Sequence, residues 1–239
     1  MIKQNTRRLK GWGRLSDAKC KIYRPRHHSE IPKILSLGNT LPYGGGRSFG
    51  DASLNDAGNL VATTTLFQSQ ELTLDELTGI LQCSSGVTQE EILKVSAPRG
   101  WILPAIPGSQ GITIGGSVAA DCHGKNHFTR GSISRHLISL NIMLANGEIV
   151  EASREMRSDL FWATVGGLGL TGVIISAKLM LQRISSVYAI HTMKGFNDVE
   201  DMINVIEENK TNYEYLIGAV DGNFKPGRPW RGSIAVGSI

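Results

Sequence analysis

Two glycine-rich stretches, separated by about sixty residues, have the residue types that bind phosphate groups. Residues 43–51 read Tyr-Gly-Gly-Gly-Arg-Ser-Phe-Gly-Asp, and residues 107–116 read Pro-Gly-Ser-Gln-Gly-Ile-Thr-Ile-Gly-Gly. Because glycine has no Cβ, several backbone N–H groups can converge on the oxygens of a pyrophosphate. The Ser48 hydroxyl and the Arg47 guanidinium add further donors in the first stretch. Either stretch alone is compatible with a plain glycine turn, but together they predict a long diphosphate ligand held along its length.

The second stretch continues into a segment of small residues. Residues 113–120 read Thr-Ile-Gly-Gly-Ser-Val-Ala-Ala, and residues 121–127 read Asp-Cys-His-Gly-Lys-Asn-His. Small side chains allow a flat ring system or the chain of a cofactor to approach the backbone closely. Gly115 and Gly116 could also open a helix whose N-terminus favours an anion.

Three further motifs lack the context that their usual chemistry needs. Residues 167–172 match G-x-G-x-x-G, but a helical pattern precedes them and a strand pattern follows, which inverts the order of a dinucleotide fingerprint. Residues 46–50 match G-x-S-x-G, yet turn-forming residues follow the serine where a nucleophile elbow needs a helix. His123 and His127 have a metal-binding spacing, but Gly124 and Asn126 between them indicate a loop, and we expect no metal site.

Composition places the chain among globular proteins. Of the 239 residues, 41% are hydrophobic and 19% charged, which excludes a disordered tail. No apolar run is long enough to cross a membrane, and the polar start lacks the apolar region of a signal peptide. The net charge of +4 mildly favours anionic partners, but the basic residues are scattered and do not indicate nucleic acid. Three cysteines without a C-x-x-C indicate neither a disulfide framework nor a thiolate metal site, and they suit a reducing compartment.

Short helices and short strands alternate irregularly along the chain, which predicts the α+β class. The patterns predict helices over residues 29–37, 88–95, 158–165 and 197–210, the second and third with capping residues at their start. They predict strands over residues 60–63, 79–83, 138–145, 148–152, 172–181 and 213–220, a strand end entering the glycine turn at 41–51, and a hairpin turn at Asn146-Gly147.

The character of the sequence changes after about Arg183, and we expect two domains, residues 1–184 and 185–239. The apolar segment at residues 234–239 reads as a strand that needs a partner, so we expect the second domain to be incomplete. An incomplete domain exposes apolar surface, which predicts poor solubility or self-association.

Two long strings of unusual composition carry a family resemblance. Residues 121–127, already quoted, and residues 160–167, Leu-Phe-Trp-Ala-Thr-Val-Gly-Gly, resemble the FAD-linked oxidases of the vanillyl-alcohol oxidase or PCMH type, and among them the decaprenylphosphoryl-ribose oxidases. The resemblance begins at Gly11-Trp12-Gly13-Arg14 and covers nearly the whole chain. It implies a PCMH-type FAD-binding domain of two small α/β subdomains, followed by the start of an incomplete substrate, or cap, domain.

Site residues follow from the resemblance position by position. The diphosphate loop falls on Tyr43, Gly44, Gly45, Gly46, Arg47, Ser48, Phe49, Gly50 and Asp51. The segment around the ribityl chain and ring falls on Gly108, Thr113, Ile114, Gly115, Gly116, Ala120, Asp121, Cys122, His123, Gly124 and Asn126, with a backbone contact near the adenine at Ile174. His123 and Lys125 are implied on the substrate side of the ring, as the catalytic candidates.

Three departures from the family pattern inform the chemistry. Many oxidases of the wider group have a histidine at the position of Arg47, bonded covalently to the flavin, so Arg47 predicts noncovalent FAD. The family commonly has Tyr at the position of Phe49 and often Cys at that of Ala120. The family's substrate domain, with its catalytic lysine and a ring-contacting tyrosine, continues beyond residue 239.

The resemblance implies an FAD-dependent oxidoreductase that oxidises the 2'-hydroxyl of a polyprenylphosphoryl ribose to a ketone, the first step of epimerisation to arabinose for a cell-wall polysaccharide. The implied partners are the lipid-linked sugar phosphate and a short-chain NAD(P)H-dependent reductase. We expect a cytoplasmic protein or one held peripherally at the inner membrane. Two alternatives stay open: a sugar-alcohol or lactone oxidase that returns electrons to oxygen, and a flavin-binding fragment without turnover.

Overall fold

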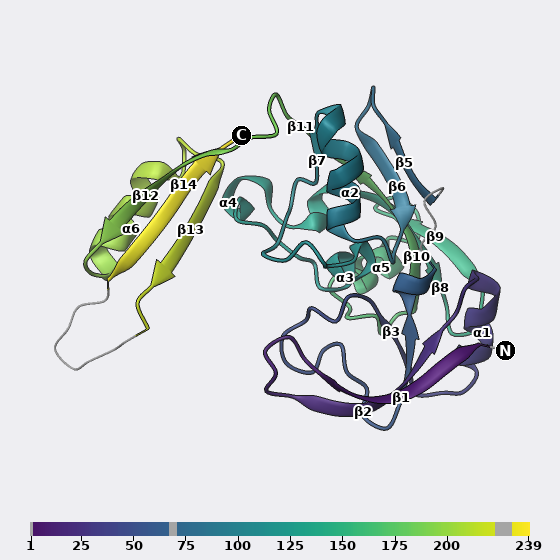
Figure 1. Ribbon diagram of the computed structural model, residues 1–239. Helices are drawn as coiled ribbons and strands as arrows, with labels where there is room; N and C mark the ends of the chain where they lie inside the picture. Colours follow the sequence, from purple (N-terminus) through teal and green to yellow (C-terminus); the bar gives the residue numbers. More distant parts are fainter. Residues whose placement is uncertain (1, 67–70, 223–230) are drawn as a thin grey trace.

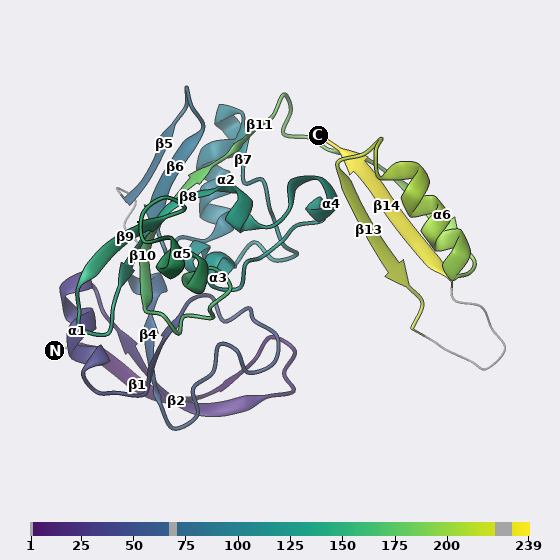
Figure 2. The same ribbon diagram turned by 180° about the vertical axis from the view of Figure 1, so that it is seen from behind.

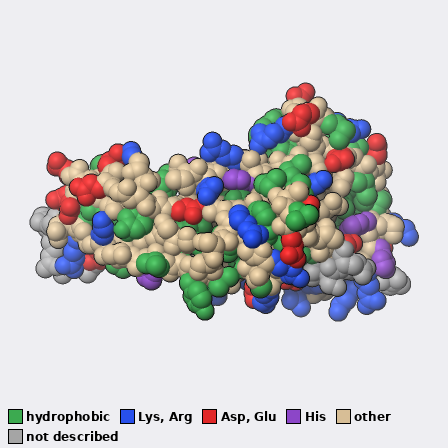
Figure 3. All heavy atoms as spheres, turned by 90° about the horizontal axis from the view of Figure 1, so that it is seen from above, with side chains coloured by type: hydrophobic (Ala, Val, Ile, Leu, Met, Phe, Trp, Pro, Cys, Tyr) green, Lys and Arg blue, Asp and Glu red, His purple; other side chains and the backbone are tan. Residues whose placement is uncertain are grey.

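The computed structural model describes residues 2–66, 71–222 and 231–239, which form three larger sheets, a two-stranded ribbon and short helices (Figures 1 and 2). Helices and strands are mixed along the chain, which confirms the α+β class. Seen from above, charged side chains of both signs are interspersed on the surface (Figure 3). Within the described residues, no helix is long and apolar enough to cross a membrane.

The first sheet has four strands in the order β1 (Lys3–Lys10), β2 (Asp17–Arg24), β4 (Asn59–Ala62), β3 (Thr40–Tyr43). β1 and β2 form an antiparallel hairpin, whereas β4 is parallel to both β2 and β3. In β2, Ala18, Cys20 and Ile22 alternate inward while the residues between them face outward. The helix expected over 29–37 is a 3-10 turn (His28–Glu30) followed by α1 (Ile31–Leu35).

The second sheet is antiparallel, with five strands in the order β5 (Leu72–Asp75), β6 (Ile80–Ser84), β10 (Val173–Met180), β8 (Leu137–Met143), β9 (Ile149–Ser153). Three helices pack on it through Ile92 of α2 (Gln89–Ser96), Ile114 of α3 (Ile114–Ala119) and Phe161 of α5 (Ser158–Thr164), all fully buried. A short ribbon pairs β7 (Trp101–Ile102) with β11 (Gln182–Arg183), and α4 (His127–Arg130) is one turn long. The core between this sheet and its helices holds α2 and α3 in place, and these two helices position the second glycine stretch.

The predicted capped start of α5 is wrong. The residue before Ser158 is Arg157, which occupies the N-cap position in a left-handed conformation (φ 49°) and forms no side-chain cap. Phe161 and Thr164 are buried, so packing rather than capping stabilises this helix.

The third sheet has the order β12 (Ile190–Phe196), β14 (Gly232–Ser238), β13 (Tyr215–Val220), and α6 (Val199–Asn209) covers one face. The strand expected over residues 234–239 is therefore the central one, with a partner on each side within this chain. The opposite face carries the side chains of Met193 and Ile217, which are 58% and 45% exposed, and the incompleteness of this domain stays a prediction. Self-association remains a prediction, and so does the domain boundary near residue 185.

One carboxylate connects the third sheet to the rest of the chain. Glu214 Oε1, just before β13, accepts from Arg130 Nε of α4 at 3.0 Å and from Gln182 Nε2 of β11 at 2.7 Å. Next to it, the Leu216 N–H donates to the carbonyl oxygen of Lys125 at 3.0 Å. The third sheet is thus attached to the loop that contains His123 and Lys125.

Candidate cofactor site

The two glycine stretches lie directly against each other. A Cβ placed on Gly44 would overlap the Thr113 hydroxyl oxygen, and one placed on Gly45 would overlap the Gly111 carbonyl oxygen. From the other side, a Cβ on Gly111 would come within 3.2 Å of Arg47 Nη2. The absence of side chains therefore lets segments that adjoin two different sheets meet, which is more than a single turn requires.

The first stretch presents consecutive unbonded N–H groups. Within the part of the chain that the structure describes, no hydrogen-bond acceptor lies on the amides of Gly44, Gly45, Gly46, Arg47, Ser48, Phe49 or Gly50. Gly46 and Gly50 have φ of 63° and 62°, the left-handed turns that reorient successive amides. Tyr43 packs its hydroxyl against Gly46, and burial raises the pKa of this phenol. Such a row of free donors suits the oxygens of a diphosphate.

Arg47 lies between this loop and the turn of the β1–β2 hairpin. Its guanidinium carbon is 4.7 Å from the centre of the Trp12 ring, and the Trp12 N–H donates to the Ser48 carbonyl oxygen at 2.9 Å. A hollow of about 360 Å³ opens here, lined by Lys10, Gly11, Trp12, Arg14, Gly46 and Arg47. The hairpin turn and the glycine loop thus form one cationic surface.

The second stretch is anchored by the N-terminus of α2. The amides of Gln89 and Glu90 donate to the carbonyl oxygens of Ile112 (2.9 Å) and Gln110 (3.0 Å). Thr88 caps the helix in a capping box with Glu91, as the sequence predicts. Because its carbonyl groups are held in this way, the stretch keeps the N–H groups of Ser109, Gln110 and Gly111 free of any acceptor among the described residues.

The structure corrects the expectation of an anion at the N-terminus of α3. The Gly115 amide donates to the Ser85 carbonyl oxygen at 2.8 Å, and the Gly116 amide donates to the Thr113 hydroxyl at 3.2 Å. Ile114, whose side chain is fully buried, donates its amide to the Val87 carbonyl oxygen at 2.8 Å. With these amides occupied, Gly115 serves instead for close packing, since its Cβ would lie 2.8 Å from that of Ser85.

A third turn, residues 166–172, packs on the end of α3, which follows the second glycine stretch, and on β3, which precedes the first. The amides of Gly166 and Leu168 donate to the carbonyl oxygens of Val118 (3.0 Å) and Ala119 (2.9 Å) at the end of α3. Gly169 has φ 81°, and a Cβ there would lie 2.5 Å from Cγ of Pro42 in β3. α5 precedes this turn and β10 follows it, so the structure agrees that its G-x-G-x-x-G pattern is not a dinucleotide fingerprint.

The loop after α3 is held by the Asp121 carboxylate, which accepts from the Ser132 hydroxyl (2.9 Å) and the Ser134 amide (3.1 Å). Burial, with a smaller effect of Asp121, raises the pKa of the neighbouring Cys122 thiol. Gly124 and Asn126 are buried, and the Asn126 amide group donates to the Pro104 carbonyl oxygen at 2.9 Å. These contacts give Asp121 and Asn126 structural roles that the sequence did not indicate.

His123 and Lys125 project from the same loop and are exposed. The His123 ring lies 4.9 Å from that of His127, and its Nδ1 is 3.3 Å from the Gly124 carbonyl oxygen. No cluster of three or more metal-ligating side chains is present among the described residues. The other implied positions differ in burial: Ala120 is exposed, Gly108 has open space where a Cβ would stand, and Ile174 is buried in β10.

Comparison with known proteins gives this arrangement a family. The sequence profile of a family described as an FAD binding domain matches residues 21–153, more than half of the chain and both glycine stretches. The chain belongs to this FAD-binding family. The cofactor of the family is FAD, and the free amides of the first stretch and the close contact between the two stretches fit its diphosphate.

Proteins similar to this chain have the names of oxidases and dehydrogenases. Decaprenylphosphoryl-beta-D-ribose oxidase of Mycolicibacterium smegmatis is 30% identical over 98% of this chain and 52% of its own length. The mitochondrial D-lactate dehydrogenase [cytochrome] of Arabidopsis thaliana is 30% identical over 76% of this chain and 33% of its own, and the mitochondrial D-2-hydroxyglutarate dehydrogenase of Bos taurus is 26% identical over 66% and 31%. The chain spans about half the length, or less, of these FAD-family relatives.

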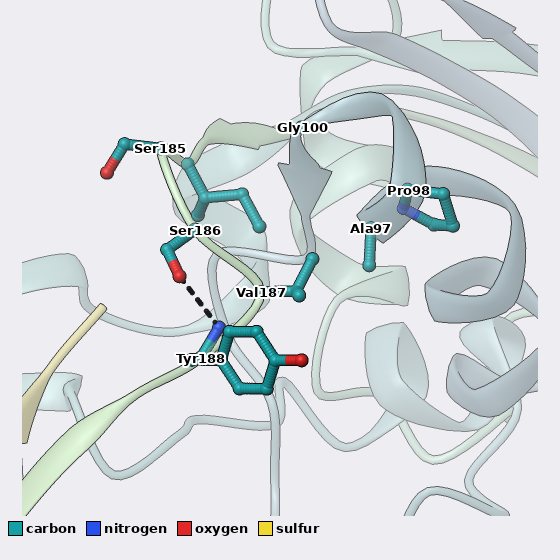
Figure 4. A pocket seen from close by; sticks show the side chains of 8 residues that line it. Ala97, Pro98, Gly100, Ser185, Ser186, Val187 and Tyr188 are labelled. Atoms are coloured by element: carbon teal, nitrogen blue, oxygen red, sulfur yellow. Dashed lines mark hydrogen bonds between the residues drawn. The ribbon is translucent and has the colours of Figure 1, made fainter.

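Sequence reasoning missed the side chains around the hairpin turn. Lys10, Trp12 and Arg14 line a hollow that borders the first glycine stretch. A tryptophan between two glycines was the available signal, since Gly11 allows the turn to approach the Gly50 carbonyl oxygen. A second hollow, about 370 Å³, lies apart from the glycine stretches, between residues 97–100 and the linker 184–188 (Figure 4). There Ser186 Oγ accepts from the Tyr188 amide at 3.0 Å, and no group with redox or acid–base chemistry other than Tyr188 lines it.

Proposed function

We propose that this chain is the FAD-binding part of an oxidoreductase that oxidises the 2'-hydroxyl of a polyprenylphosphoryl ribose to a ketone. The observation that carries the proposal is the contact between the two glycine stretches, with a row of free amides beside it. The similarity to the decaprenylphosphoryl-ribose oxidase supports the substrate, because it extends over 98% of this chain, beyond the family's FAD-binding segment.

The glycine stretches bind and orient the cofactor in this proposal. Amides of residues 44–50 and 109–111, with Arg47, hold the diphosphate, and the small residues 113–120 allow close approach of the rest of the group. When bound, FAD supplies the oxidising power by accepting a hydride from the substrate carbon. Arg47 stands at the position where many oxidases of the wider group have the histidine that is bonded covalently to the flavin. The proposal therefore includes noncovalent binding of FAD.

His123 is proposed to face the substrate. With the proton on Nδ1 directed at the Gly124 carbonyl oxygen (3.3 Å), Nε2 is free to accept the proton of a substrate hydroxyl. Lys125, exposed in the same loop, is proposed to bind the anionic phosphate of the substrate. Both side chains sit on a loop that Asp121 and Asn126 fix to the protein.

The remaining expectations belong to the same proposal. Residues 1–184 form the FAD-binding domain of two subdomains, and residues 185–239 begin a substrate domain. The ketone product requires a reductase, for which a short-chain NAD(P)H-dependent enzyme is the proposed partner. The chain is proposed to act in the cytoplasm or at the inner membrane surface.

An anaerobic test distinguishes the candidate reactions. FAD-loaded protein is mixed with a polyprenylphosphoryl ribose, with D-lactate or D-2-hydroxyglutarate, or with a sugar alcohol, and loss of the visible flavin absorbance is followed. The proposal is supported if the polyprenylphosphoryl ribose bleaches the flavin and none of the other substrates does. Bleaching by a hydroxy acid or a sugar alcohol instead would replace it with a relative's chemistry or with the lactone-oxidase alternative.

A flavin-binding module without turnover of its own is the second candidate, favoured by the row of free amides, which needs only a diphosphate as its ligand. It predicts that FAD remains bound and that none of these substrates bleaches it. Under this second candidate, His123→Ala changes nothing, because no bleaching occurs. Under the main proposal, His123→Ala slows bleaching of the flavin about 10²-fold and leaves FAD bound.

A further inference from the structure

β12 is an outer strand of the third sheet, and one of its two edges has no partner among the described residues. The other edge pairs with β14 over residues 190–196. Beyond that ladder, no backbone hydrogen bond joins β12 to any part of the chain that the structure describes. An outer strand in this state presents a row of unpaired N–H and C=O groups to which another strand can add. Figure 1 shows the third sheet at the side of the molecule away from α1.

The outer strands of the other sheets each carry a feature that discourages such addition. β1 has four lysine and arginine side chains, and β3 and β5 are only four residues long, with Pro42 in β3. In β9, the Glu151 carbonyl oxygen already accepts from Arg157 Nη1 at 3.0 Å. On the far side of the third sheet, β13 is occupied by the hydrogen bond from the Leu216 amide to the Lys125 carbonyl oxygen.

β12 has none of these features. It is seven residues long and contains neither proline nor an acidic residue. Its one lysine, Lys194, donates from Nζ to Asn209 Oδ1 of α6 at 2.8 Å, so this cation is directed at the helix. The side chains of Ile190 and Met193 are 82% and 58% exposed. A long, exposed edge with so little charge is a site at which chains associate.

The sequence of β12 is complementary to itself in one symmetric register. An antiparallel pairing centred on Met193 uses all seven residues, with Met193 opposite its own copy and Ile190 opposite Phe196. Lys194 then lies opposite Thr192, so no two like charges face each other across the strands. A contact of this kind is closed by a two-fold axis and stops at two chains.

We propose that β12 pairs with β12 of a second copy of this chain, which joins two three-stranded sheets into one sheet of six strands. A strongly charged partner strand would find no free counter-charge on β12, whereas a second copy brings the same uncharged, exposed residues. The inference goes beyond the proposed function, because it does not depend on which substrate is oxidised. It also gives the expected self-association a defined surface.

The test is sedimentation velocity of the FAD-loaded chain over a range of concentrations, which should show a monomer–dimer equilibrium. Met193→Lys places two cations opposite each other and should weaken the dimer about five-fold or more. Mixing this variant with Met193→Glu should restore dimers. The matched control is Met156→Lys, since Met156 is 42% exposed in the turn before α5. All variants should keep the circular dichroism spectrum and the bound FAD of the parent chain.

Cysteine substitution tests the register. Met193→Cys places two thiols opposite each other across the two-fold axis, so mild oxidation should yield a covalent dimer. His191→Cys is the control, because position 191 lies opposite Gly195 of the second copy and should not cross-link to itself. The parent chain, whose three cysteines are buried or half-buried, gives the background of oxidation.

Hydrogen exchange distinguishes a second copy from any other cover of this edge. The amides of residues 190–196 should become more protected as the concentration of the chain rises. Protection that is independent of concentration would mean that a segment of the same chain covers β12, which contradicts the proposal. A parent chain that stays monomeric, equal effects of Met193→Lys and Met156→Lys, or no cross-link through position 193 would each overturn it as well.

Discussion

At Gly45 the first glycine stretch meets the backbone of the second. An added methyl group would overlap the Gly111 carbonyl oxygen, and backbone on both sides leaves no flexible side chain to move away. Gly45→Ala should therefore separate the stretches and raise the dissociation constant for FAD at least ten-fold, measured by fluorescence titration. Gly222→Ala, with open space around its Cβ, is the control and should bind FAD like the parent chain. Equal affinity of both variants would contradict the geometry.

Cys83 predicts a loss of stability at alkaline pH. Burial in β6 raises the pKa of its thiol from 9.0 to about 12. Between these values the unfolded chain releases the thiol proton and the folded chain keeps it, so stability is complete below about pH 9 and falls by up to ~1.4 kcal/mol per pH unit above it. Denaturant titrations of the parent and of Cys83→Ala across this range test the sign. The variant should show a shallower decline, and an equal or steeper one would show that the thiol stays protonated in both states.

At the scale of elements, α2 connects helix capping to the cofactor site. Thr88→Ala removes the side-chain cap and should cost about 1 kcal/mol of stability. Because the first amides of α2 hold the carbonyl groups of Ile112 and Gln110, the same change should also weaken FAD binding. Thr88→Ser keeps the hydroxyl and should restore both properties. A stability loss with FAD affinity unchanged would mean that α2 does not hold the second stretch.

The sequence predicts individual elements well where the hydrophobic pattern agrees with the capping and turn residues at the ends of the element. Thr88 with Glu91 located α2, and Asn146-Gly147 located the hairpin between β8 and β9. β1 was not predicted, because Lys3–Lys10 is polar apart from Leu9. This strand is stabilised by pairing along the edge of β2. The edge strand's residues alternate only weakly, so the period-2 signal is absent.

The candidate site was predictable in composition but not in arrangement. Glycine at positions 44, 45 and 111 indicated close approach, yet no local pattern says that Gly45 meets Gly111 or that Gly169 meets Pro42. Nor could the sequence show that the amides of Gly115 and Gly116 are occupied, since their acceptors, Ser85 and Thr113, are fixed by the packing of α3 on the sheet.

At the scale of the whole molecule, Glu214 holds the third sheet to the main body. Its side chain, 18% exposed, bonds to both Arg130 and Gln182. Glu214→Ala should speed hydrogen exchange at the Leu216 amide and across residues 190–220, while residues 1–184 keep their protection. Glu207→Ala, in a surface pair with Lys210 on α6, should leave exchange unchanged. Equal exchange in the two variants would mean that backbone contacts alone hold the sheet.

The central claim is that the two glycine stretches hold FAD without a covalent bond. The most direct measurement is the visible spectrum of the purified chain after it is mixed with FAD and desalted, repeated on the supernatant after acid precipitation. We predict that flavin stays with the chain through desalting and appears entirely in the acid supernatant. Flavin in the acid pellet would contradict the role given to Arg47. A folded chain that retains no flavin would show that residues 44–50 and 109–111 do not by themselves bind FAD.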